Sequence, residues 1–590
     1  MKNFLRRLTA TALALVSVLS YALFSVNAAE NTFSYIYVEN TGNDGGVISY
    51  RYIDENGNEI VPQQRLTRQR ALLPSSYNAV DEGLVTRVKS QGESGVCWAF
   101  SAMSLMESDS IAKGYKTLAD ADFSEAHHTW FTGRGRAESE SDLAYGDGYY
   151  VEEPYLRGGN WKMSAASLAR WTGVANERDF PFYDGSLENM GNYPEAERYN
   201  TSSGIIIESA QSLTTAEKVK QWITEHGSAT VAFYYDDSCY NYPTSSYCTS
   251  TSGTINHQVV VVGWDDNYSA SNFGSACTPS GDGAWICKNS WTSYWGDGGY
   301  FYISYYDASL SMFAGFTVQK SDDYYKNYTY NGAEWYSAMG LDKPLQVANV
   351  FTATGYESLS AIAVQTYGSD IQIKATVYKN IKAGYTSPIK GTASATLETV
   401  IANEGYHTIY LDSPVELNPG EIFSVVVRYY NPNGMTYIPV EKNTPDGLAY
   451  SSRKDESYID VSGSGNIWKA ASSQGAHNFY IQALTKCNHQ LEAEGTEATC
   501  TENGSEKIYC TQCGKIEAQR VLKATGHSYG EWSDFRYDIS EGRRISECVC
   551  GKCGNCMQRA FYNDNVISLD AFIDLLFNKF RLIILKIFSI

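Results

Sequence analysis

The amino-acid sequence predicts an α+β domain, an all-β sandwich and a small cysteine-rich tail, in that order. Within residues 72–318 a helix-like stretch after Cys97 comes first and strand-like runs follow, which is typical of an α+β domain. Residues 320–485 consist of short alternating strands separated by turn signals, which favours a sandwich. The tail, residues 486–556, holds eight cysteines.

The length and net charge of the chain limit the classes of function that it can have. A chain of 590 residues is too long for one hydrophobic core, so several domains are expected. Its 46 basic and 66 acidic side chains give a net charge of -20. Most of such a surface repels nucleic acid and anionic lipid, which argues against either as a main partner.

The N-terminus has the features of a secretory signal peptide over residues 1–28. A lysine and two arginines precede a mostly apolar stretch, and Val26-Asn27-Ala28 offers small residues for cleavage. A membrane anchor that stays in place is the alternative. We expect a mature protein that begins near Ala29 and is secreted or extracellular, with retention at the cell surface left open.

Residues 29–71 have two interpretations. They form either a short pro-segment, trimmed at the basic site that Arg65, Arg68 and Arg70 offer, or a surface lead-in with two β-like runs. The sequence does not decide between them.

The sandwich region shows the strand pattern most clearly near residue 371. Ile371, Ile373, Ala375 and Val377 alternate with polar residues, as in a strand with one buried face. Turn signals follow at residues 418–420 and 431–434, on either side of an apolar run.

Cys97 follows a glycine-containing loop and opens an apolar, helix-compatible stretch. We expect it at a helix N-terminus, where the dipole and free N–H groups lower the pKa of the thiol. A cysteine at the start of an apolar helix is by itself more often a core residue than a nucleophile. The flanking residues, Gln91 to Ser101, favour the nucleophile.

Two further blocks follow this segment in order. Residues 256–264 read Asn-His-Gln-Val-Val-Val-Val-Gly-Trp, and residues 288–300 contain Asn-Ser-Trp and Trp-Gly-Asp-Gly-Gly-Tyr. Together the three blocks resemble the active-site signature of papain-like cysteine peptidases, over about residues 72–318. The resemblance implies a two-lobed catalytic domain that acts on proteins or peptides and needs no cofactor for catalysis.

The resemblance also implies a role for each matching residue. Cys97 would attack the peptide carbonyl as a thiolate, and His257 would accept its proton and later protonate the leaving amine. Asn289 would orient the imidazole. The Gln91 side chain and the Cys97 backbone N–H would form the oxyanion hole.

Three residues are expected to line the substrate site. Gly158 and Gly159 resemble the glycine pair on one wall of the family's cleft, where substrate backbone approaches closely. Trp291 would also shield the bond between the histidine and the asparagine from water. A bare Gly-Gly is otherwise only a turn.

The sequence departs from the family pattern in three ways. Ser94 stands where many members have a disulfide cysteine, and Cys97 and His257 are 160 residues apart, against about 130–150 in the family. The pairs Cys239–Cys248 and Cys277–Cys287 could replace the usual disulfides, although the sequence does not fix the pairing. No long helical region precedes residue 72, which argues against control by a large pro-domain.

Residues 320–485 resemble the lectin-like β domains that follow papain-like domains in some bacterial surface peptidases. Trp335, Tyr336, Tyr367 and Trp468 could stack on surface glycans, although aromatic residues in a sandwich are more often core. A structural spacer or a substrate-positioning module is the alternative.

The tail, residues 486–556, resembles small ribbon-like modules of bacterial surface proteins. A first group gathers around Cys510 and Cys513, and contains Cys487, His489, Cys500 and His527. A second group contains Cys548, Cys550, Cys553 and Cys556. The spacing fits structural zinc, but disulfides are equally compatible and neither group offers a clean set of four ligands.

The last segment, residues 571–590, is apolar but carries four charges that fall on one side of a helix. It is expected to be an amphipathic helix that contacts a membrane surface, the cell wall or a partner without spanning the membrane.

These observations favour a secreted cysteine endopeptidase that forms a thioester acyl-enzyme. A surface adhesin or carbohydrate-binding protein that uses the peptidase fold as a scaffold is the alternative. A transferase that applies the same chemistry to an amide is a third interpretation. Peptide specificity, activation and oligomeric state are not readable from the sequence.

Overall fold

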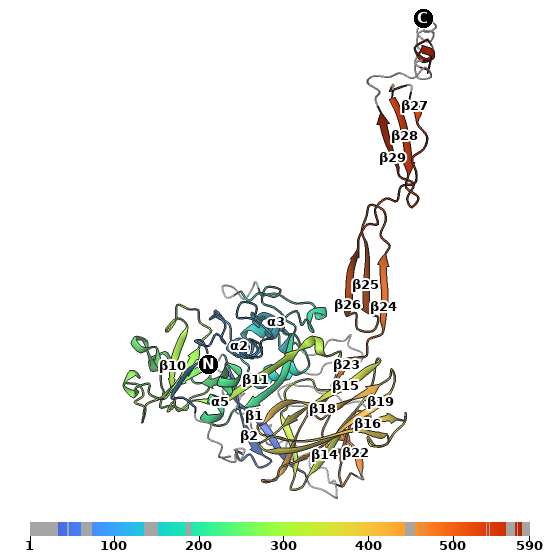
Figure 1. Ribbon diagram of the computed structural model, residues 1–590. Helices are drawn as coiled ribbons and strands as arrows, with labels where there is room; N and C mark the ends of the chain where they lie inside the picture. The colour runs from blue at the N-terminus through green and yellow to red at the C-terminus, as the bar shows by residue number, and fades with distance from the viewer. Residues whose placement is uncertain are drawn as a thin grey trace. The chain divides into compact units, whose positions relative to one another are not determined.

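The computed structural model describes residues 33–43, 46–60, 73–134, 151–183, 190–442, 455–462, 464–465, 467–538, 540–541, 543–561, 573–574 and 576–580. They form two compact units, residues 1–488 and 489–590, each of which is described by itself (Figure 1). The expected signal peptide and the arginines at positions 65, 68 and 70 lie outside the described residues.

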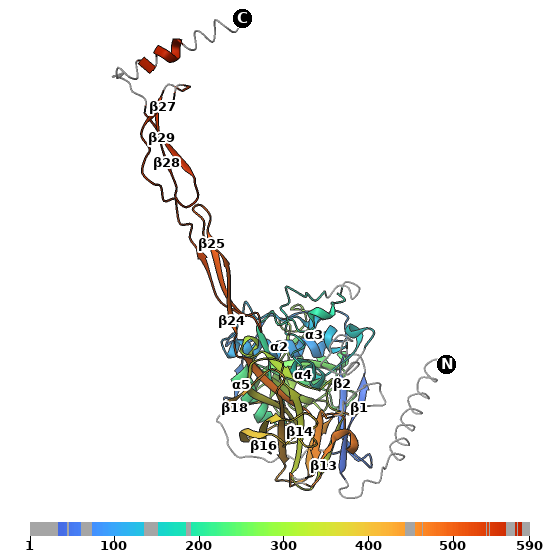
Figure 2. The same ribbon diagram turned by 90° about the vertical axis from the view of Figure 1, so that its right-hand side faces the viewer.

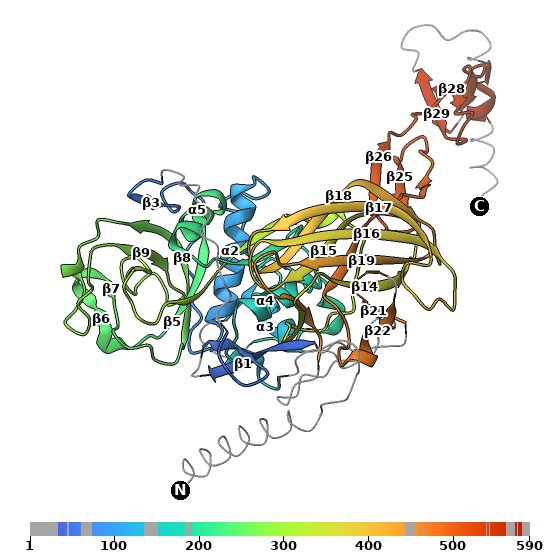
Figure 3. The same cartoon turned by 90° about the horizontal axis from the view of Figure 1, so that it is seen from below.

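The described residues of the peptidase region include four α-helices. They are α2 (Cys97–Ala112), α3 (Glu125–Thr132), α4 (Trp161–Ala169) and α5 (Ala216–His226). The first 14 residues of α2 are buried on every side, which explains why its sequence is apolar without an amphipathic stripe. This central helix lies between the strands of the peptidase region and those of the sandwich (Figure 3).

Strands that pair mostly antiparallel, with β7 and β10 pairing in parallel, build the second lobe of the peptidase region. Their bounds are β3 (Ser76–Asn78), β4 (Ile205–Ser212), β5 (Ala229–Phe233), β6 (Tyr240–Asn241), β7 (Ser246–Tyr247), β8 (His257–Asp265), β9 (Ala284–Lys288), β10 (Tyr300–Ser304) and β11 (Ser311–Lys320). The predicted valine run forms β8, whose first eight residues are buried. Helical segments first and strands later confirm the α+β prediction.

The sandwich contains two facing layers. A six-stranded sheet has the order β17-β16-β19-β14-β21-β22, and the opposite layer contains β12, β23, β15 and β18. Their bounds are β12 (Lys326–Tyr328), β14 (Leu345–Thr352), β15 (Glu357–Thr366), β16 (Ile371–Ile381), β17 (Thr392–Ile401), β18 (Gly405–Leu417), β19 (Ile422–Tyr430), β21 (Ser457–Asp460), β22 (Trp468–Ala470) and β23 (Ile481–Cys487). The alternation on β16 is confirmed, because its apolar residues are buried between the layers.

The boundary between the peptidase region and the sandwich does not interrupt hydrogen bonding. Strand β18 pairs with β4 through Gly405–Gln211, Tyr406–Ala210 and His407–Ser209. One sheet therefore continues from the peptidase strands into one layer of the sandwich.

Residues 33–60 form strands, in agreement with the two β-like runs. Strand β1 (Ser34–Asn43) pairs with β2 (Ile48–Asp54) on one side and with β13 (Ser337–Leu341) on the other. Strand β20 (Thr436–Val440) completes this four-stranded sheet. The N-terminal segment is thus built into the sandwich region (Figure 2).

The second unit consists of two three-stranded sheets. The first contains β24 (Leu491–Thr496), β25 (Gly504–Cys510) and β26 (Ile516–Leu522), and the second contains β27 (Arg536–Asp538), β28 (Arg543–Val549) and β29 (Cys556–Phe561). Of residues 571–590, positions 573–574 and 576–580 are described, and they are helical. Within the described parts of the chain, no helix is both long and apolar enough to cross a membrane.

Candidate active site

Cys97 is the first residue of α2, as expected, and its side chain is fully buried. Burial raises the pKa of its thiol to about 12, and backbone hydrogen bonds involving Gln258 and Trp98 lower it by less. The expectation of a lowered thiol pKa is therefore wrong for this state of the protein. Away from water, the loss of thiolate solvation outweighs the helix N-terminus.

His257 opens strand β8 and is held by Asn289. The His257 Nε2 and Asn289 Oδ1 atoms lie 2.8 Å apart, and the same oxygen accepts the Ser290 backbone N–H at 2.8 Å. Burial lowers the pKa of the imidazole to about 4, and the bond to Asn289 opposes that effect. The neutral ring is the form to which a thiol can transfer its proton.

Aromatic rings enclose this pair. Trp291 stacks on His257 with ring centroids 4.5 Å apart and an interplanar angle of 18°. Tyr235, which the sequence analysis missed, meets Trp291 edge-on at 4.8 Å and lies 6.3 Å from the imidazole. The arrangement keeps water from the His257–Asn289 bond, the shielding expected of Trp291.

Gln91 is fixed in the loop before α2 and is buried. Its Oε1 accepts the Ser290 hydroxyl at 2.6 Å, and its Nε2 donates to the Ser94 carbonyl at 2.8 Å. Ser94 occupies the position of the missing cysteine, and its hydroxyl donates to the Gln91 carbonyl at 2.7 Å. Hydrogen bonds thus hold the loop together at the position where many family members have a disulfide cysteine.

The N-terminal segment occupies the space beside the nucleophile. The Gly46 carbonyl oxygen lies 3.3 Å from Cys97 Sγ. A Cβ atom at position 46 would lie 2.7 Å from the Asn256 oxygen and 2.8 Å from Cys97 Sγ. Only glycine fits there, between the cysteine and the residue that precedes His257.

Gly159 holds the same segment from the other side. The Ile48 N–H donates to the Gly159 carbonyl at 2.9 Å, and the Gly159 N–H donates to the Gly46 carbonyl at 3.4 Å. The ring of Trp98 covers Gly159 so closely that a Cβ there would meet it at 2.6 Å. Gly158, the other half of the expected pair, is buried beside it. No pattern in the sequence indicated that residues 46–48 would pair with Gly159.

The disulfide in the peptidase region differs from both suggested pairs. Cys248 bonds to Cys277, whereas Cys239 and Cys287 carry free thiols. Cys287 is buried on β9, where it packs in the hydrophobic core. The pairing depends on long-range contacts, which spacing along the chain does not reveal.

Three of the four aromatic residues proposed to stack on sugars belong to the core. Trp335, Tyr336 and Tyr367 are 2%, 7% and 6% exposed, which leaves no ring face for a ligand. Trp468 instead lines an open groove of about 830 Å³ on the six-stranded sheet. The groove is also lined by Gln346, Gln372, Lys374, Tyr378, Glu398 and Arg428.

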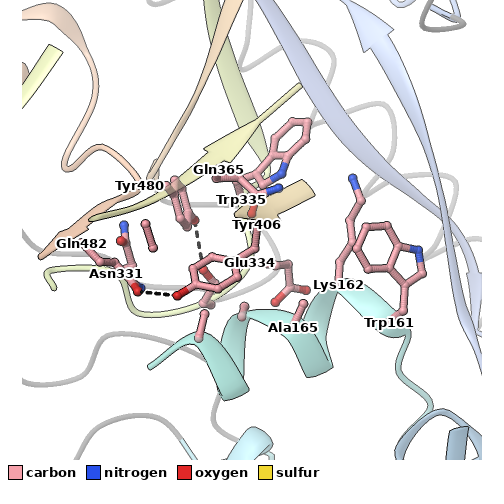
Figure 4. Close-up of a pocket in the computed structure, with 14 residues that line it drawn as sticks. Trp161, Lys162, Ala165, Asn331, Glu334, Trp335, Gln365, Tyr406, Tyr480 and Gln482 are labelled. Carbon is pink, nitrogen blue, oxygen red and sulfur yellow. Dashed lines mark hydrogen bonds between the residues drawn. The ribbon is translucent and has the colours of Figure 1, made fainter. Parts of the chain in front are cut away.

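A smaller cavity of about 30 Å³ lies where α4 meets the sandwich (Figure 4). Lys162 and Trp335 are among its lining residues. Its volume suits a water molecule and is too small for a sugar or a peptide side chain.

The cysteine groups of the tail also differ from the expected sets. The ligand atoms of Cys500, His527, Cys550 and Cys553 all lie within 4.8 Å of one another. Cys500 and His527 therefore belong with the second group, while Cys548 and Cys556 lie outside this set. We call the sheet of β24, β25 and β26 with its loops the first module of the tail, and the sheet of β27, β28 and β29 with its loops the second module. In the first module, His489 Nδ1 and Cys513 Sγ are 3.4 Å apart. Such clusters could hold a metal.

Two sequence profiles match the chain. The papain family cysteine protease profile matches residues 73–128 and 149–315, and the lectin-like domain profile matches residues 327–485. Curated relatives include gamete and mating-type specific protein A of Dictyostelium discoideum, 26% identical over 39% of this chain and 42% of that protein. The probable cysteine protease RDL2 of Arabidopsis thaliana is 25% identical over 42% of this chain and 59% of that protein. The chain thus spans about half the length of these relatives.

Solved structures extend the likeness to both regions. The cysteine protease and lectin-like domains of Cwp84, a surface layer associated protein of Clostridium difficile, superpose with a TM-score of 0.63 at 26% identity. The match covers 75% of this chain and 93% of that one. The same clostridial protease after propeptide cleavage gives a TM-score of 0.61 at 26% identity, over 70% of this chain and 100% of that one. The chain therefore carries a papain-family cysteine protease domain followed by a lectin-like domain.

Proposed function

We propose that the protein is a secreted cysteine endopeptidase whose catalytic residues are Cys97, His257 and Asn289. The observation that carries this proposal is the His257–Asn289 contact of 2.8 Å beneath Trp291. The imidazole is neutral and oriented, and the backbone of its neighbour Gln258 hydrogen-bonds to the thiol of Cys97 at the start of a buried helix. No cofactor is needed for this chemistry.

In the proposed reaction, His257 accepts the proton of Cys97 and the thiolate attacks the carbonyl carbon of the scissile peptide. The carbonyl π electrons move to oxygen, where the Gln91 amide and the Cys97 backbone N–H stabilise the negative charge. Collapse breaks the C–N bond, and the amine leaves with the proton from His257. A water molecule then gives a proton to His257, attacks the thioester and releases the acid and the thiol.

An epoxysuccinyl thiol probe tests the assignment of the nucleophile. The chain lacking residues 29–71 is incubated with the probe and, separately, with a peptide library. We expect labelling and cleavage that Cys97→Ala abolishes and that Cys239→Ser, which removes another free thiol of this domain, retains. Equal cleavage by Cys97→Ala would refute the proposal. Product analysis separates hydrolysis from transfer to an added amine, the alternative reaction.

Residues 29–71 act in this proposal as a pro-segment that keeps the enzyme latent. Gly46 lies against Cys97 Sγ, and the Gly159 backbone holds the segment by two hydrogen bonds. A peptide substrate would need the same space. The clostridial protease, whose structure was solved after propeptide cleavage, supports an analogous activation step. Cleavage near Arg65, Arg68 or Arg70 would release the segment.

The proposal includes a location at the cell surface. The N-terminal signal pattern and the surface layer association of the clostridial protein support it. At the other end, Ile573, Leu576, Phe577 and Phe580 follow a helical i, i+3, i+4, i+7 spacing and are 41% to 73% exposed. This apolar stripe suits contact with a membrane surface or the cell wall.

The lectin-like domain suggests glycan binding in addition to catalysis. The groove on the six-stranded sheet combines the partly exposed ring of Trp468 with polar side chains such as Gln372 and Arg428. Planar polar groups beside an aromatic ring suit a sugar, whose hydroxyls and apolar face they contact.

A glycan array probed with the full chain tests this second function. We expect binding that Trp468→Ala weakens and that Tyr356→Ala, an exposed ring outside the groove, leaves unchanged. Unaltered binding by Trp468→Ala would exclude the groove. Glycan binding without any peptide cleavage would favour the adhesin interpretation.

A further inference from the structure

The second unit has almost no hydrophobic core. Among its described residues, the buried apolar side chains are one isoleucine and four cysteines: Ile545, Cys500, Cys510, Cys548 and Cys550. Every residue of β24 is exposed, and so are six of the seven residues of β26. Sheets of this size do not gain enough free energy from burial to fold alone, so a cross-link or a metal must stabilise them.

Four side chains from the loops and turns of the two sheets come close together in this unit. Cys500 comes from the loop before β25, His527 from the linker, and Cys550 and Cys553 from the turn between β28 and β29. Their ligand atoms lie within 4.8 Å of one another. Three thiols and one imidazole form a donor set typical of structural Zn²⁺.

The distances match a tetrahedral site. Cys500 Sγ and Cys550 Sγ are 3.7 Å apart, and Cys553 Sγ and His527 Nδ1 are 3.2 Å apart. Zinc–sulfur bonds of about 2.3 Å at tetrahedral angles place two sulfurs about 3.8 Å apart, whereas bonded sulfurs lie about 2.05 Å apart. Three cysteines also cannot all pair with one another.

The backbone is arranged to support a thiolate at Cys550. The Ser528 N–H donates to Cys550 Sγ at 3.3 Å, and the backbone of Lys552 and Cys553 bonds to the same sulfur. The Gly554 N–H closes the turn on the Cys550 carbonyl at 2.9 Å. N–H donors around a metal-bound sulfur orient the ligand and stabilise its charge.

The first module repeats the turn. The Gly514 N–H bonds to the Cys510 carbonyl at 2.8 Å, and Cys513 Sγ lies 3.4 Å from His489 Nδ1. The spacing from the histidine to the first cysteine of the turn is similar, 21 residues in this module and 23 in the next. The second group also includes Cys500, which lies in the first module.

We propose that Cys500, His527, Cys550 and Cys553 bind one structural Zn²⁺ ion that joins the two modules of the tail. Because Cys500 belongs to the first module and the other three ligands to the second, the ion links consecutive modules. The proposal is independent of the peptidase reaction.

The test measures zinc bound to the purified full chain and to single variants. We expect Cys553→Ser and His527→Ala to lose about one equivalent of zinc relative to the unchanged protein. Cys556→Ser, which removes a neighbouring exposed thiol outside the ligand set, retains it. His527→Cys, which restores a fourth ligand, also retains it, and this separates loss of a ligand from general misfolding.

A second measurement replaces zinc by Co²⁺. Tetrahedral thiolate coordination gives intense visible absorption that Cys553→Ser weakens and Cys556→Ser does not. Two results would overturn the proposal: equal zinc content in the unchanged protein and Cys553→Ser, or a disulfide between any two of Cys500, Cys550 and Cys553 in the unreduced protein. Failure of His527→Cys to bind zinc would also contradict it.

Discussion

Hydrogen bonds hold two side-chain amides of the proposed site, Gln91 and Asn289, in place. Asn289 accepts from the imidazole of His257, while Gln91 is clamped between Ser94 and Ser290. Ser290 links both sides, because its backbone N–H donates to Asn289 and its hydroxyl donates to Gln91. Rigid donors stabilise a developing charge without reorganising during the reaction.

We therefore predict that Gln91→Ala lowers kcat by about 100- to 1000-fold, the usual loss for one oxyanion-hole donor. KM should change much less, because the donor acts mainly in the transition state. Steady-state kinetics on the activated enzyme, with labelling of Cys97 as a check of folding, measures both constants. A large rise in KM at constant kcat would instead place Gln91 in ground-state binding.

At the scale of elements, residues 46–48 and the Gly159 backbone form a short parallel pairing across the cleft. Strand β1 anchors this segment, since it pairs with β13 of the lectin-like domain. The latency proposed above thus rests on a close fit at Gly46, where a Cβ would approach Cys97 Sγ to 2.8 Å.

We predict that Gly46→Val displaces the segment and makes the uncleaved chain partly active. The thiol of Cys97 then becomes accessible to alkylation, and its pKa falls from about 12 as burial decreases. The alkylation rate measured against pH reports both effects. Glu55→Ala, an exposed change in the same segment, serves as the control. Equal rates in the unchanged chain and Gly46→Val would contradict latency through this contact.

At the scale of the whole first unit, a buried ion pair and a tyrosine that hydrogen-bonds to it connect three parts of the chain. Lys162 on α4 lies 3.0 Å from Glu404 next to β18, with side chains 5% and 7% exposed. Tyr52 on β2 hydrogen-bonds to both. Burial lowers the pKa of Lys162, and the charge of Glu404 opposes that shift.

We predict that Glu404→Gln reduces the free energy of unfolding by about 3–5 kcal/mol, because it removes the carboxylate that pairs directly with the buried Lys162 ammonium and leaves only the weaker effect of Glu334. Glu398→Gln breaks a pair of similar length with Lys374 on the open groove and should cost less than about 1 kcal/mol. Urea denaturation of both variants makes the comparison. Similar losses of unfolding free energy in the two variants would mean that burial does not determine how much breaking an ion pair destabilises the protein.

Acid sensitivity is a second property of the whole molecule. Burial lowers the pKa of four histidines to about 4 or below: His127, His128, His257 and His407. The unfolded chain binds protons on these rings below about pH 6.5 and the folded chain does not, so their contribution to stability is complete above pH 6.5 and falls between about pH 6.5 and 4. Each ring contributes up to about 1.4 kcal/mol per pH unit in this window.

Two buried carboxyls act in the opposite direction. Burial raises the pKa of Glu125 to about 7 and that of Glu177 to about 8, so they lower stability as the pH rises above their unfolded values. Burial also raises the pKa of a third carboxyl, Asp307, and lowers the pKa of a fifth imidazole, His477. Because the five rings outnumber the three carboxyls, we expect a net loss of stability on acidification. We expect a lower urea midpoint at about pH 5 than at about pH 7, and a shallower dependence in His407→Gln. A higher midpoint at the acidic pH would show that the carboxyls dominate.

The sequence by itself determined the parts that depend on local pattern. The position of Cys97 at the start of α2, the buried run of β8 and the alternation on β16 follow from hydrophobic periodicity, which acts over a few residues. The candidate residues His257, Asn289 and Gln91 follow from short motifs, and their residue types limit the chemistry available to them.

The tertiary structure decided everything that depends on contacts between distant segments. It buried the thiol of Cys97, with Gly46 against its sulfur, and this burial reversed the expected direction of the thiol pKa. It paired Cys248 with Cys277 and grouped Cys500 with Cys550, choices that spacing along the chain leaves open. The physical reason is common to these cases: burial, pairing and coordination depend on distances in space, which one-dimensional order constrains only weakly.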